Sequence, residues 1–478
     1  MPSRSGRFVL SARALQRLLG EWDTGGPAYR RLADRLRMLI IDGRISVGTW
    51  LPAERELAEV LQRSRTTVIS AYASLRDTGH LHSVRGAGSR VTLANRAGST
   101  RGFEPAGPLD LSKAAVPIWP GLSALLRDVA AGFGVADAGS GLDLVGDVRL
   151  RQAIADGYTA DGLETLPEQI MVTVGAQHAI SLIAGALLDR GDRVVVETPT
   201  YPHAVEAFRD AGARIVSVPV TDEGWDVAAL SDVIDRARPA MAYVMPDFHN
   251  PTGHRMDTAT RASVAALTAG ARTLLVVDET TRPLNLDAGD QLPTLAAMPT
   301  AGDLTITLGS MGKTVWHGLR IGWIRADPSL ISRIAMFRAA RDLGTPRLDQ
   351  LVATGALARM PEILTARNDR MRAGRDLIRD LIEHHLPEWE LPDTRGGVSF
   401  WINLGVPASS QLALAARARG VVISPGPRFG IDGEHERRLR IPFTAPPEEL
   451  RAGVPLLADA WRSMNVEAPS PVAPGRLL

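Results

Sequence analysis

The chain has 478 residues, of which 45% are hydrophobic and 22% charged, and its formal net charge is +1. This length exceeds what one core usually holds, so two or more domains are expected, and no apolar run approaches the roughly 20 residues of a membrane span. Because cysteine is absent, disulfides and thiolate metal sites are excluded, and no metal site is predicted. The start lacks the apolar core of a secretory signal, which favours the cytoplasm.

Residues 1–26 are predicted to be a polar leader, and three helices are predicted after it. Leucines at helical spacing indicate a helix over residues 29–41. Pro52, followed by acidic residues, marks the start of a short second helix, since acidic side chains favour the first turn. Ser64 is a suitable N-cap for a third helix that closes near Gly79. Three helices in this space predict a helix-turn-helix.

A hairpin with a glycine-rich tip is predicted over residues 81–91, so residues 27–93 are expected to form an α+β winged helix-turn-helix. Between positions 27 and 95, eleven arginines outnumber six acidic residues, which gives +5 and leaves −4 for the rest of the chain. This asymmetry is typical of a domain that contacts nucleic acid. In such a module the third helix enters the major groove, and the wing reaches phosphates or the minor groove. The candidates for DNA contact on that helix are Ser64, Arg65, Thr66 and Thr67.

Three stretches of this module resemble the GntR family of bacterial regulators. They are LPAERELA at 51–58, SRTTV at 64–68 and LRDTG at 75–79, followed by Arg85 and Gly86. The resemblance spans the module and implies that the protein binds double-stranded DNA. Some family members carry an arginine where this chain has Ile69, so the operator preference does not transfer. The positions that the resemblance assigns to DNA contact are Arg55, Arg65, Thr66, Thr67, Arg85 and Gly86.

Residues 94–108 are rich in glycine, proline and small polar residues and are predicted to be a flexible linker. Beyond them, apolar strand-like runs alternate with helical stretches. This alternation predicts an α/β domain with a mostly parallel sheet over residues 109–465, and residues 466–478 are expected to be a disordered tail. The strand-like runs are 170–174, 194–196, 242–245 and 274–277.

Lysine occurs only at Lys113 and Lys313, so 52 of the 54 basic residues (54 minus 2) are arginine. Arginine stays protonated and cannot act as a neutral amine nucleophile, whereas lysine can. Lys313 follows a further strand-like run at 304–308 and lies in SMGKT, a setting of hydroxyls and small residues. It is therefore predicted to form a Schiff base with pyridoxal phosphate (PLP). Lys113 has no neighbouring signature and is assigned no role.

Residues suited to a pyridine phosphate follow the other strands, where the carboxyl ends of parallel strands meet. A carboxylate beside the pyridine nitrogen keeps it protonated, an amide bonds the ring hydroxyl, and a basic group with small-residue donors holds the phosphate. Asp278, Asn250 and Arg320 are assigned these three roles in that order. The phosphate donors are Ser310 and the turn Gly175-Ala176-Gln177, whose N–H groups open a helix.

The large domain, over residues 109–460, resembles the fold type I, class I and II aminotransferases. The resemblance implies a homodimer and gives Arg440 the role of binding a ligand carboxylate, with Arg438 as the competitor. A GntR-type module joined to this domain is the layout of the MocR subfamily of transcriptional regulators. The motifs that carry the resemblance are Gly175-Ala176-Gln177, Pro199-Thr200-Tyr201, Asn250-Pro251-Thr252-Gly253, Asp278-Glu279 and Ser310-Met311-Gly312-Lys313, with Arg320. Tyr201 and Thr281 are included among the cofactor contacts on this basis.

Two positions depart from the aminotransferase pattern. Thr281 replaces a tyrosine that donates to the cofactor ring oxygen, and Gly141 replaces one that reaches the phosphate of the neighbouring subunit. Both leave PLP binding in place and weaken the case for efficient turnover.

Three hypotheses follow. In the preferred one, a DNA-binding regulator takes PLP, with or without an amino compound, as its effector. In the second, an aminotransferase carries an accessory DNA-binding module, which the complete winged helix and Thr281 oppose. In the third, a degenerate domain has lost PLP and serves only for dimerisation. The presence of Lys313, Asp278, Asn250 and Arg320 opposes it.

Overall fold

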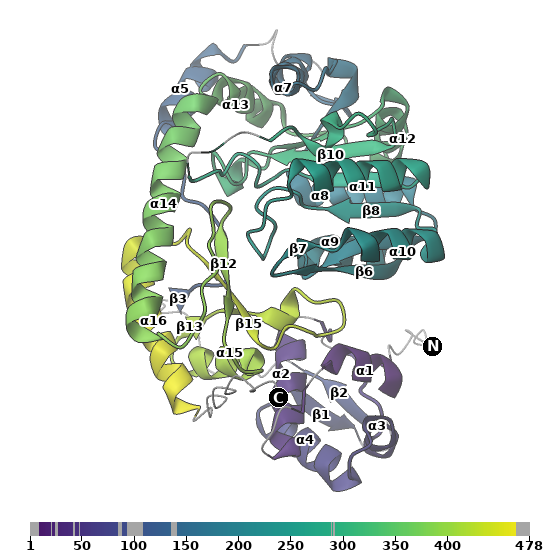
Figure 1. The fold of residues 1–478 in the computed structure, drawn as a ribbon, viewed down its shortest axis with the longest axis vertical. Coiled ribbons are helices and arrows are strands. Elements are labelled where there is room, and N and C mark those ends of the chain that lie inside the picture. Colours follow the sequence, from purple (N-terminus) through teal and green to yellow (C-terminus); the bar gives the residue numbers. More distant parts are fainter. Residues whose placement is uncertain are drawn as a thin grey trace, which may run out of the picture.

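The structure, a computed structural model, has two parts that follow each other along its long axis (Figure 1). The N-terminal part is small and mainly helical, and the larger part is built around an eight-stranded sheet. No helix in the described part of the chain is long and apolar enough to cross a bilayer. The structure describes residues 9–20, 22–23, 27–41, 44–46, 48–84, 88–92, 109–134, 141–287, 289 and 292–464.

Four helices and a two-stranded hairpin form the N-terminal domain around one apolar core, which includes Leu36, Leu57 and Val68. The predicted helix-turn-helix and wing are confirmed, because α3 packs on α4 and β1 pairs with β2 in antiparallel register. The elements are α1 (Ala12–Leu19), α2 (Ala28–Ile41), α3 (Glu54–Leu61), α4 (Arg65–Asp77), β1 (Leu81–Val84) and β2 (Gly88–Val91).

Part of the predicted polar leader is a helix instead. Within residues 1–26, Ser11 caps α1 by accepting a hydrogen bond from the Ala14 N–H at 3.2 Å. The prediction was wrong here because polar residues between the apolar positions give this short stretch a polar average, although the apolar positions share one face. The side chains of α1 that are buried in the domain core are Ala12, Leu15 and Leu19. The predicted linker at 94–108 and tail at 466–478 lie outside the described residues.

The sheet of the large domain has the strand order β4-β11-β10-β9-β8-β5-β6-β7. Parallel pairing joins β10, β9, β8, β5 and β6, whereas β11 and β7 run antiparallel to their neighbours. The predicted mostly parallel sheet is therefore confirmed. The strands are β4 (Ile170–Thr173), β5 (Arg193–Thr198), β6 (Arg214–Thr221), β7 (Gly224–Trp225), β8 (Met241–Val244), β9 (Leu274–Asp278), β10 (Thr305–Ser310) and β11 (Gly322–Arg325).

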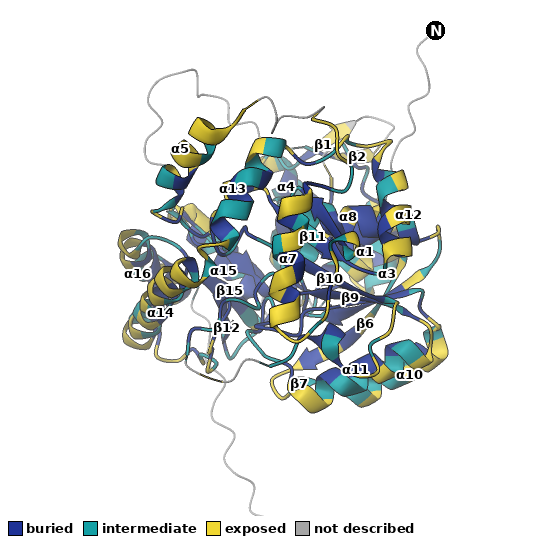
Figure 2. Cartoon of the chain, turned by 90° about the horizontal axis from the view of Figure 1, so that it is seen from above, coloured by how far each residue is buried: buried dark blue, intermediate teal, exposed yellow. Residues whose placement is uncertain are grey.

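Helices cover both faces of this sheet. Successive side chains of a strand point to opposite faces, so neighbouring residues of one strand pack in different cores. Val194 and Val196 pack in the core formed with α8, α9 and α12, and Val195 packs in the core formed with α10 and α11. Figure 2 shows the buried strands between helices whose outer faces are exposed. The helices are α8 (Ala176–Leu187), α9 (Pro202–Asp210), α10 (Val227–Ala237), α11 (Thr258–Gly270) and α12 (Pro328–Arg338).

The long helix α14 (Met360–His385) connects this sheet to a C-terminal subdomain (Figure 1). A three-stranded sheet of the order β12-β15-β14 packs there with α15 and α16, and β13 pairs with β3. The elements are β3 (Leu109–Asp110), β12 (Ser399–Asn403), α15 (Ser409–Ala418), β13 (Val421–Val422), β14 (Ser424–Pro425), β15 (Arg438–Pro442) and α16 (Pro447–Ser463). At the opposite end of α14 lie α5 (Leu122–Gly132), α7 (Val148–Ala160) and α13 (Arg347–Leu357).

Candidate functional site

The predicted cofactor residues follow strands that run in the same direction, so they meet at one edge of the sheet. The turn at Gly175 follows β4, Tyr201 follows β5 and Asn250 follows β8, while Asp278 ends β9 and Ser310 ends β10. Lys313 lies three residues beyond β10, and Arg440 reaches the same edge from β15, where its Nη1 donates to Asn250 Oδ1 at 3.2 Å.

The turn at Gly175 opens α8 against the guanidinium of Arg320. Gly175 has φ +87°, and a Cβ there would lie 3.0 Å from Arg320 Nη2; a Cβ at Gly322 would lie 2.7 Å from the Gly175 carbonyl carbon. Arg320 Nη2 donates to Val174 O at 2.7 Å, which holds the exposed guanidinium beside the turn. The first-turn N–H groups of a helix have no partner within the helix, so together with Arg320 they are suited to bind an anion.

His178 supports this turn from within α8, a role that the sequence did not reveal. Its Nδ1 accepts a hydrogen bond from the Val174 N–H at 3.0 Å, and its Nε2 lies 2.9 Å from Asp342 Oδ2. Burial lowers the pKa of His178, and the neighbouring Arg338 lowers it further. A neutral ring that accepts at Nδ1 and donates at Nε2 satisfies both partners.

Lys313 is half-buried, and its Nζ donates to Ala114 O at 2.5 Å. Burial lowers the pKa of Lys313 to about 8, with a further contribution from the charge of Arg440, while Asp278 opposes the shift. A lysine with this pKa has far more neutral amine at pH 7 than an exposed one, and the neutral amine is the nucleophile.

Arg367 of α14 holds two backbone segments beside Lys313: the residues that follow it and the segment near Ala114, whose carbonyl accepts a hydrogen bond from Nζ. Its Nε donates to Thr314 O at 2.8 Å, and its Nη2 donates to Val315 O at 3.0 Å and to Pro117 O at 2.7 Å. It thereby ties the residues after Lys313 to the segment whose Ala114 carbonyl accepts the amine. No sequence signal marks this contact, because arginine is abundant and α14 is remote in the chain.

Asp278 is buried, and hydrogen bonds fix its carboxylate. Its Oδ2 accepts from Tyr243 Oη at 2.7 Å, and its Oδ1 accepts from the Thr280 N–H at 2.9 Å. Burial raises the pKa of Tyr243 well above its usual range, and the charge of Asp278 adds to the effect. Thr281, at the position where the resemblance expects a tyrosine, donates its hydroxyl proton to Asp247 O at 2.7 Å.

Arg440 and Arg438 have different surroundings although they lie on the same strand. Arg440 is 8% exposed, donates to Asn250 Oδ1 and to Ser112 O, and stacks over Phe429 with its Cζ 4.8 Å from the ring centre. Burial lowers the pKa of Arg440 to about 10. Arg438 instead pairs with the exposed Asp222. Of the two candidates for a ligand carboxylate, Arg440 is therefore the one beside the predicted cofactor residues.

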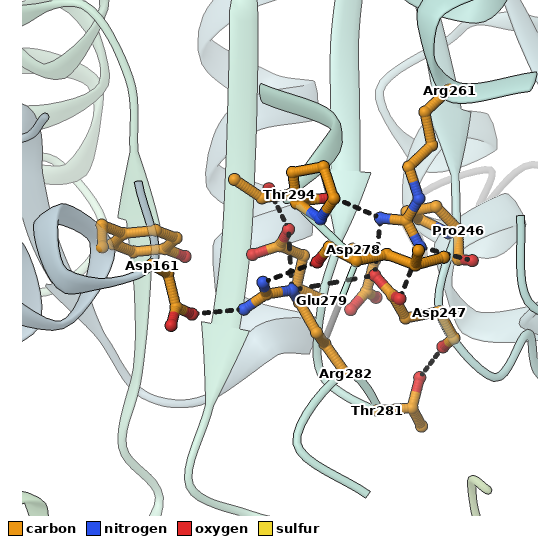
Figure 3. A network of polar contacts seen from close by, with 12 residues as sticks. Asp161, Pro246, Asp247, Arg261, Asp278, Glu279, Thr281, Arg282 and Thr294 are labelled. Carbon is orange, nitrogen blue, oxygen red and sulfur yellow. Dashed lines mark hydrogen bonds and ion pairs between the residues drawn. The ribbon is translucent and has the colours of Figure 1, made fainter. Parts of the chain in front are cut away.

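Beneath this edge lies a buried cluster of charges, shown in Figure 3, that holds the loop after β8. Arg261 of α11 donates to both oxygens of Asp247, at 3.1 and 2.5 Å, and also to backbone carbonyls. Arg282 Nε lies 3.9 Å from Glu279 Oε1, and the same oxygen accepts a hydrogen bond from Thr294 Oγ1. Burial raises the pKa of Glu279 to about 7, although Arg282 opposes the shift.

The predicted DNA contacts lie together at the start of α4 and on α3. Ser64 caps α4 by accepting from the Thr67 N–H at 3.1 Å, and its Oγ lies 2.8 Å from Thr67 Oγ1. Arg65 and Thr66 are exposed in the first turn. Arg55 is exposed on α3, with Nε 3.4 Å from Glu59 Oε1. The wing positions Arg85 and Gly86 lie outside the described residues.

The residues at the sheet edge fit pyridoxal phosphate. The absence of a side chain at Gly175 lets the Arg320 guanidinium lie against the turn that opens α8, and Asp278 supplies a fixed buried carboxylate for a pyridine nitrogen. Burial raises the pKa of Tyr201 to about 12, and the charge of Asp278 adds to the effect. Among the described residues, the buried polar atoms without a hydrogen-bond partner include Gln177 Oε1, Thr200 Oγ1 and Arg440 Nε.

Comparisons with known proteins agree with this arrangement. The family model for aminotransferase class I and II matches residues 136–455, and that for bacterial regulatory proteins of the gntR family matches residues 28–91. The uncharacterized HTH-type transcriptional regulator YisV of Bacillus subtilis is 28% identical over 92% of this chain and 96% of its own. The probable rhizopine catabolism regulatory protein MocR of Rhizobium meliloti is 31% identical over 64% of this chain and 67% of its own.

Among solved structures, LysN, the alpha-aminoadipate aminotransferase of Thermus thermophilus, complexed with N-(5'-phosphopyridoxyl)-L-leucine, matches with a TM-score of 0.67. It is 27% identical, and the match covers 75% of this chain and 93% of that one. The two predicted domains and the fold type I architecture are thus confirmed, and the relatives are consistent with the MocR subfamily. Pyridoxal phosphate is the cofactor of this fold.

Proposed function

Because the chain belongs to the class I and II aminotransferase family and carries a GntR-type DNA-binding domain, we propose that it is a transcriptional regulator controlled by PLP. The observation that carries the proposal is the coexistence, in one chain, of Lys313 in a site that fits PLP and of an exposed Arg65 and Thr66 at the start of α4. A protein with both can read the cofactor and bind an operator.

Each predicted cofactor residue has a distinct role in this proposal. PLP, when bound, supplies an aldehyde for the lysine amine and a ring that withdraws electrons. Lys313 would hold the cofactor covalently, and Asp278 would hold a proton at the pyridine nitrogen. Asn250 would bond the ring hydroxyl. Arg320, Ser310 and the N–H groups of the Gly175-Ala176-Gln177 turn would hold the phosphate.

An amino compound with a carboxylate is the proposed second ligand. Arg440 is buried beside Asn250 and has an Nε–H without a partner among the described residues. A carboxylate would satisfy that donor in a charge-assisted hydrogen bond. The amino group of the same compound would then lie toward Lys313, whose pKa Arg440 helps to lower.

The second candidate function is transamination, which the intact Lys313 and Asp278 favour. Two observations argue for weak turnover. Thr281 donates its hydroxyl proton to Asp247 O, so that proton is directed to the backbone. Gly141 has no side chain, so this position supplies no aromatic ring to the phosphate of a neighbouring subunit. We therefore expect residual activity at most.

A homodimer in the cytoplasm completes the proposal. Val148, Leu343 and Leu348 are 60%, 59% and 43% exposed. They lie near the Asp143–Gly344 bridge between the segments before α7 and α13. Exposed apolar side chains grouped in this way are typical of an interface, and a two-fold dimer would offer two recognition helices to paired half-sites.

Absorbance and activity measurements on matched lysine variants test the proposal. We expect a visible band of lysine-bound PLP in the wild type, its loss in Lys313→Ala, and its retention in Lys113→Ala, since Lys113 is 74% exposed and paired with Asp110. Protein that stays colourless with added PLP would favour the PLP-free dimerisation domain. Rapid amino-donor turnover without any shift of its own upstream DNA would favour the aminotransferase.

A further inference from the structure

The two domains meet through a buried polar contact around Arg35 of α2. Arg35 Nε donates to Leu19 O at 2.9 Å, Nη1 donates to Ser410 Oγ at 2.8 Å and to Glu436 Oε1 at 3.0 Å, and Nη2 donates to Gly433 O at 3.0 Å. Arg35 is 4% exposed and Glu436 is 7% exposed. A buried pair of this kind defines one docked arrangement of the domains, because separating the partners leaves an uncompensated charge unless water enters.

Two glycines bring the backbones of the domains together at this contact. Gly20, at the end of α1, has φ +57°, and a Cβ there would lie 2.7 Å from Asp432 O. Gly433 has φ +88°, and a Cβ there would lie 2.5 Å from Arg35 Nη2. Met38 of α2 is buried in the core of the C-terminal subdomain. The interface is therefore closely fitted on both sides.

Residues 426–436, the bridging segment, connect this contact to the cofactor site. The carbonyl of Phe429 accepts from the Thr200 N–H at 2.9 Å, and its ring lies against Arg440. Glu434 Oε1 accepts from Thr198 Oγ1 at 2.6 Å. One part of the segment thus rests on Arg440 and on the turn between β5 and α9, and another part supplies Gly433 and Glu436 to Arg35.

We infer that the bridging segment transmits the occupancy of the cofactor site to the DNA-binding domain, with the Arg35–Glu436 pair as a latch. The inference rests on the proposed function and specifies its regulation. A ligand that binds Arg440 would shift the guanidinium against which the Phe429 ring lies. A cofactor ring beside Tyr201 would act on the adjacent Thr200, whose N–H donates to the Phe429 carbonyl. Gly433 and Glu436 lie in the same short segment, so a shift of the segment breaks several Arg35 hydrogen bonds together. Packed interfaces of this kind switch between discrete arrangements.

DNA affinity with and without saturating PLP tests the latch. In full-length wild-type protein, we expect PLP to change the Kd for labelled DNA from upstream of its own gene by about fivefold or more, the lower range of measured allosteric couplings. In Arg35→Met and Glu436→Gln we expect a ratio within about twofold with an unchanged PLP band. The control Arg437→Met should keep the wild-type ratio, because Arg437 is exposed and donates to Gly405 O. A wild-type ratio in both latch variants would overturn the inference.

Hydrogen exchange of α2 separates the latch from the proposed regulation. Added PLP should change exchange of the α2 amides in the wild type and leave it unchanged in Gly433→Ala, which is expected to hold the domains apart in either state. A changed α2 exchange without any change in DNA affinity would support the latch and reject the regulator. PLP binding with no response in α2 would overturn the latch, whatever the DNA does.

Discussion

Two buried arginines near the same edge of the sheet differ in how completely they are paired. Arg261 uses Nε, Nη1 and Nη2 in five hydrogen bonds, to both oxygens of Asp247 and to the carbonyls of Met256, Pro293 and Pro246 (Figure 3). Arg440 donates to one amide oxygen and one carbonyl, and its Nε has no partner among the described residues. No carboxylate is bonded to Arg440 among those partners.

This difference separates architecture from recognition. A buried charge that is fully paired within the protein holds the loop in place and offers nothing to a ligand. A buried charge that keeps an unpaired donor is costly unless something else pairs with it. The comparison therefore predicts that Arg261 matters for stability and that Arg440 matters for binding.

The largest expected effect is on stability. Arg261→Met removes the shortest ion pair of the fully buried Asp247, which keeps Arg255 Nε at 3.3 Å and Arg282 Nε at 4.0 Å. The free energy of unfolding should therefore fall by about 3 kcal/mol, the lower end of the range for a broken buried pair. Chemical denaturation of the full-length protein measures this loss. Arg236→Met is the matched control, because Arg236 pairs with Asp232 on the surface and an exposed pair contributes about 1 kcal/mol or less. Equal losses in the two variants would contradict the comparison.

Arg440→Met is expected to act on ligand binding instead. Losing a charge-assisted hydrogen bond of about 1.5–3 kcal/mol should weaken the binding of carboxylate-bearing amino compounds about tenfold to a hundredfold. Its free energy of unfolding should fall by less than about 1 kcal/mol, because apolar replacement of a buried charge is often neutral. Spectral titration of the PLP-loaded protein with the common amino acids measures the affinity.

Two controls make this test specific. Arg438→Met lies two residues away on β15 and pairs with Asp222 at the surface, so it should bind amino acids as the wild type does. For each amino acid that binds, the corresponding amine without the carboxylate should bind the wild type and Arg440→Met with similar affinity. Equal weakening for amines and amino acids would mean that Arg440 does not contact the carboxylate.

A smaller effect is expected in the pH dependence of PLP capture. The pKa of Lys313 is lowered to about 8, so the fraction of neutral amine is about one half at pH 8 and levels off one to two pH units above that value. The rate at which the apoprotein captures PLP, followed by absorbance, should show this plateau. Removing the nearby cation in Arg440→Met should move the plateau to higher pH. A rate that still rises beyond pH 10 in the wild type would contradict the lowered pKa.

The smallest expected effect concerns Glu279 in the cluster of Figure 3. Its pKa is raised by burial from an ordinary value of 4.5 to about 7. As pH rises from about 4.5 to 7, the unfolded chain loses the proton while the folded chain retains it, so the wild type loses stability over this range. Glu279→Gln cannot lose that proton. Thermal unfolding at pH 5 and pH 7 should therefore show the variant gaining relative to the wild type at the higher pH; an equal difference at both would exclude the raised pKa.

Much of the fold was predictable because its signals are local. Alternating apolar runs and the Ser64 cap marked strands and helices, and parallel strands bring their following residues to one edge. The rarity of lysine singled out Lys313 as the candidate for the Schiff base, since arginine cannot supply a neutral amine. The prediction of a polar leader missed α1, because this helix is short and its buried face is defined only by its contact with the rest of the domain.

The remaining parts of the site depend on contacts between distant segments. Arg367 donates to backbone carbonyls of residues that are distant in the sequence, such as Thr314. His178 accepts from the backbone N–H of Val174, four positions earlier. No sequence motif marks either contact. The sequence does not distinguish Arg440 from Arg438, because each precedes an apolar residue on β15. Only the contacts of each side chain in the structure do so. The Arg35 contact joins α2 to a loop 401 residues later, and nothing in either segment alone indicates it.

The most direct test of the proposed regulation is footprinting of the DNA upstream of its own gene with the PLP-loaded protein and with the PLP-free protein. We expect protection of paired half-sites, with a midpoint concentration that PLP shifts about fivefold or more. Identical midpoints for fully loaded and PLP-free protein would contradict the proposed regulation, because PLP would then bind without any influence on the operator.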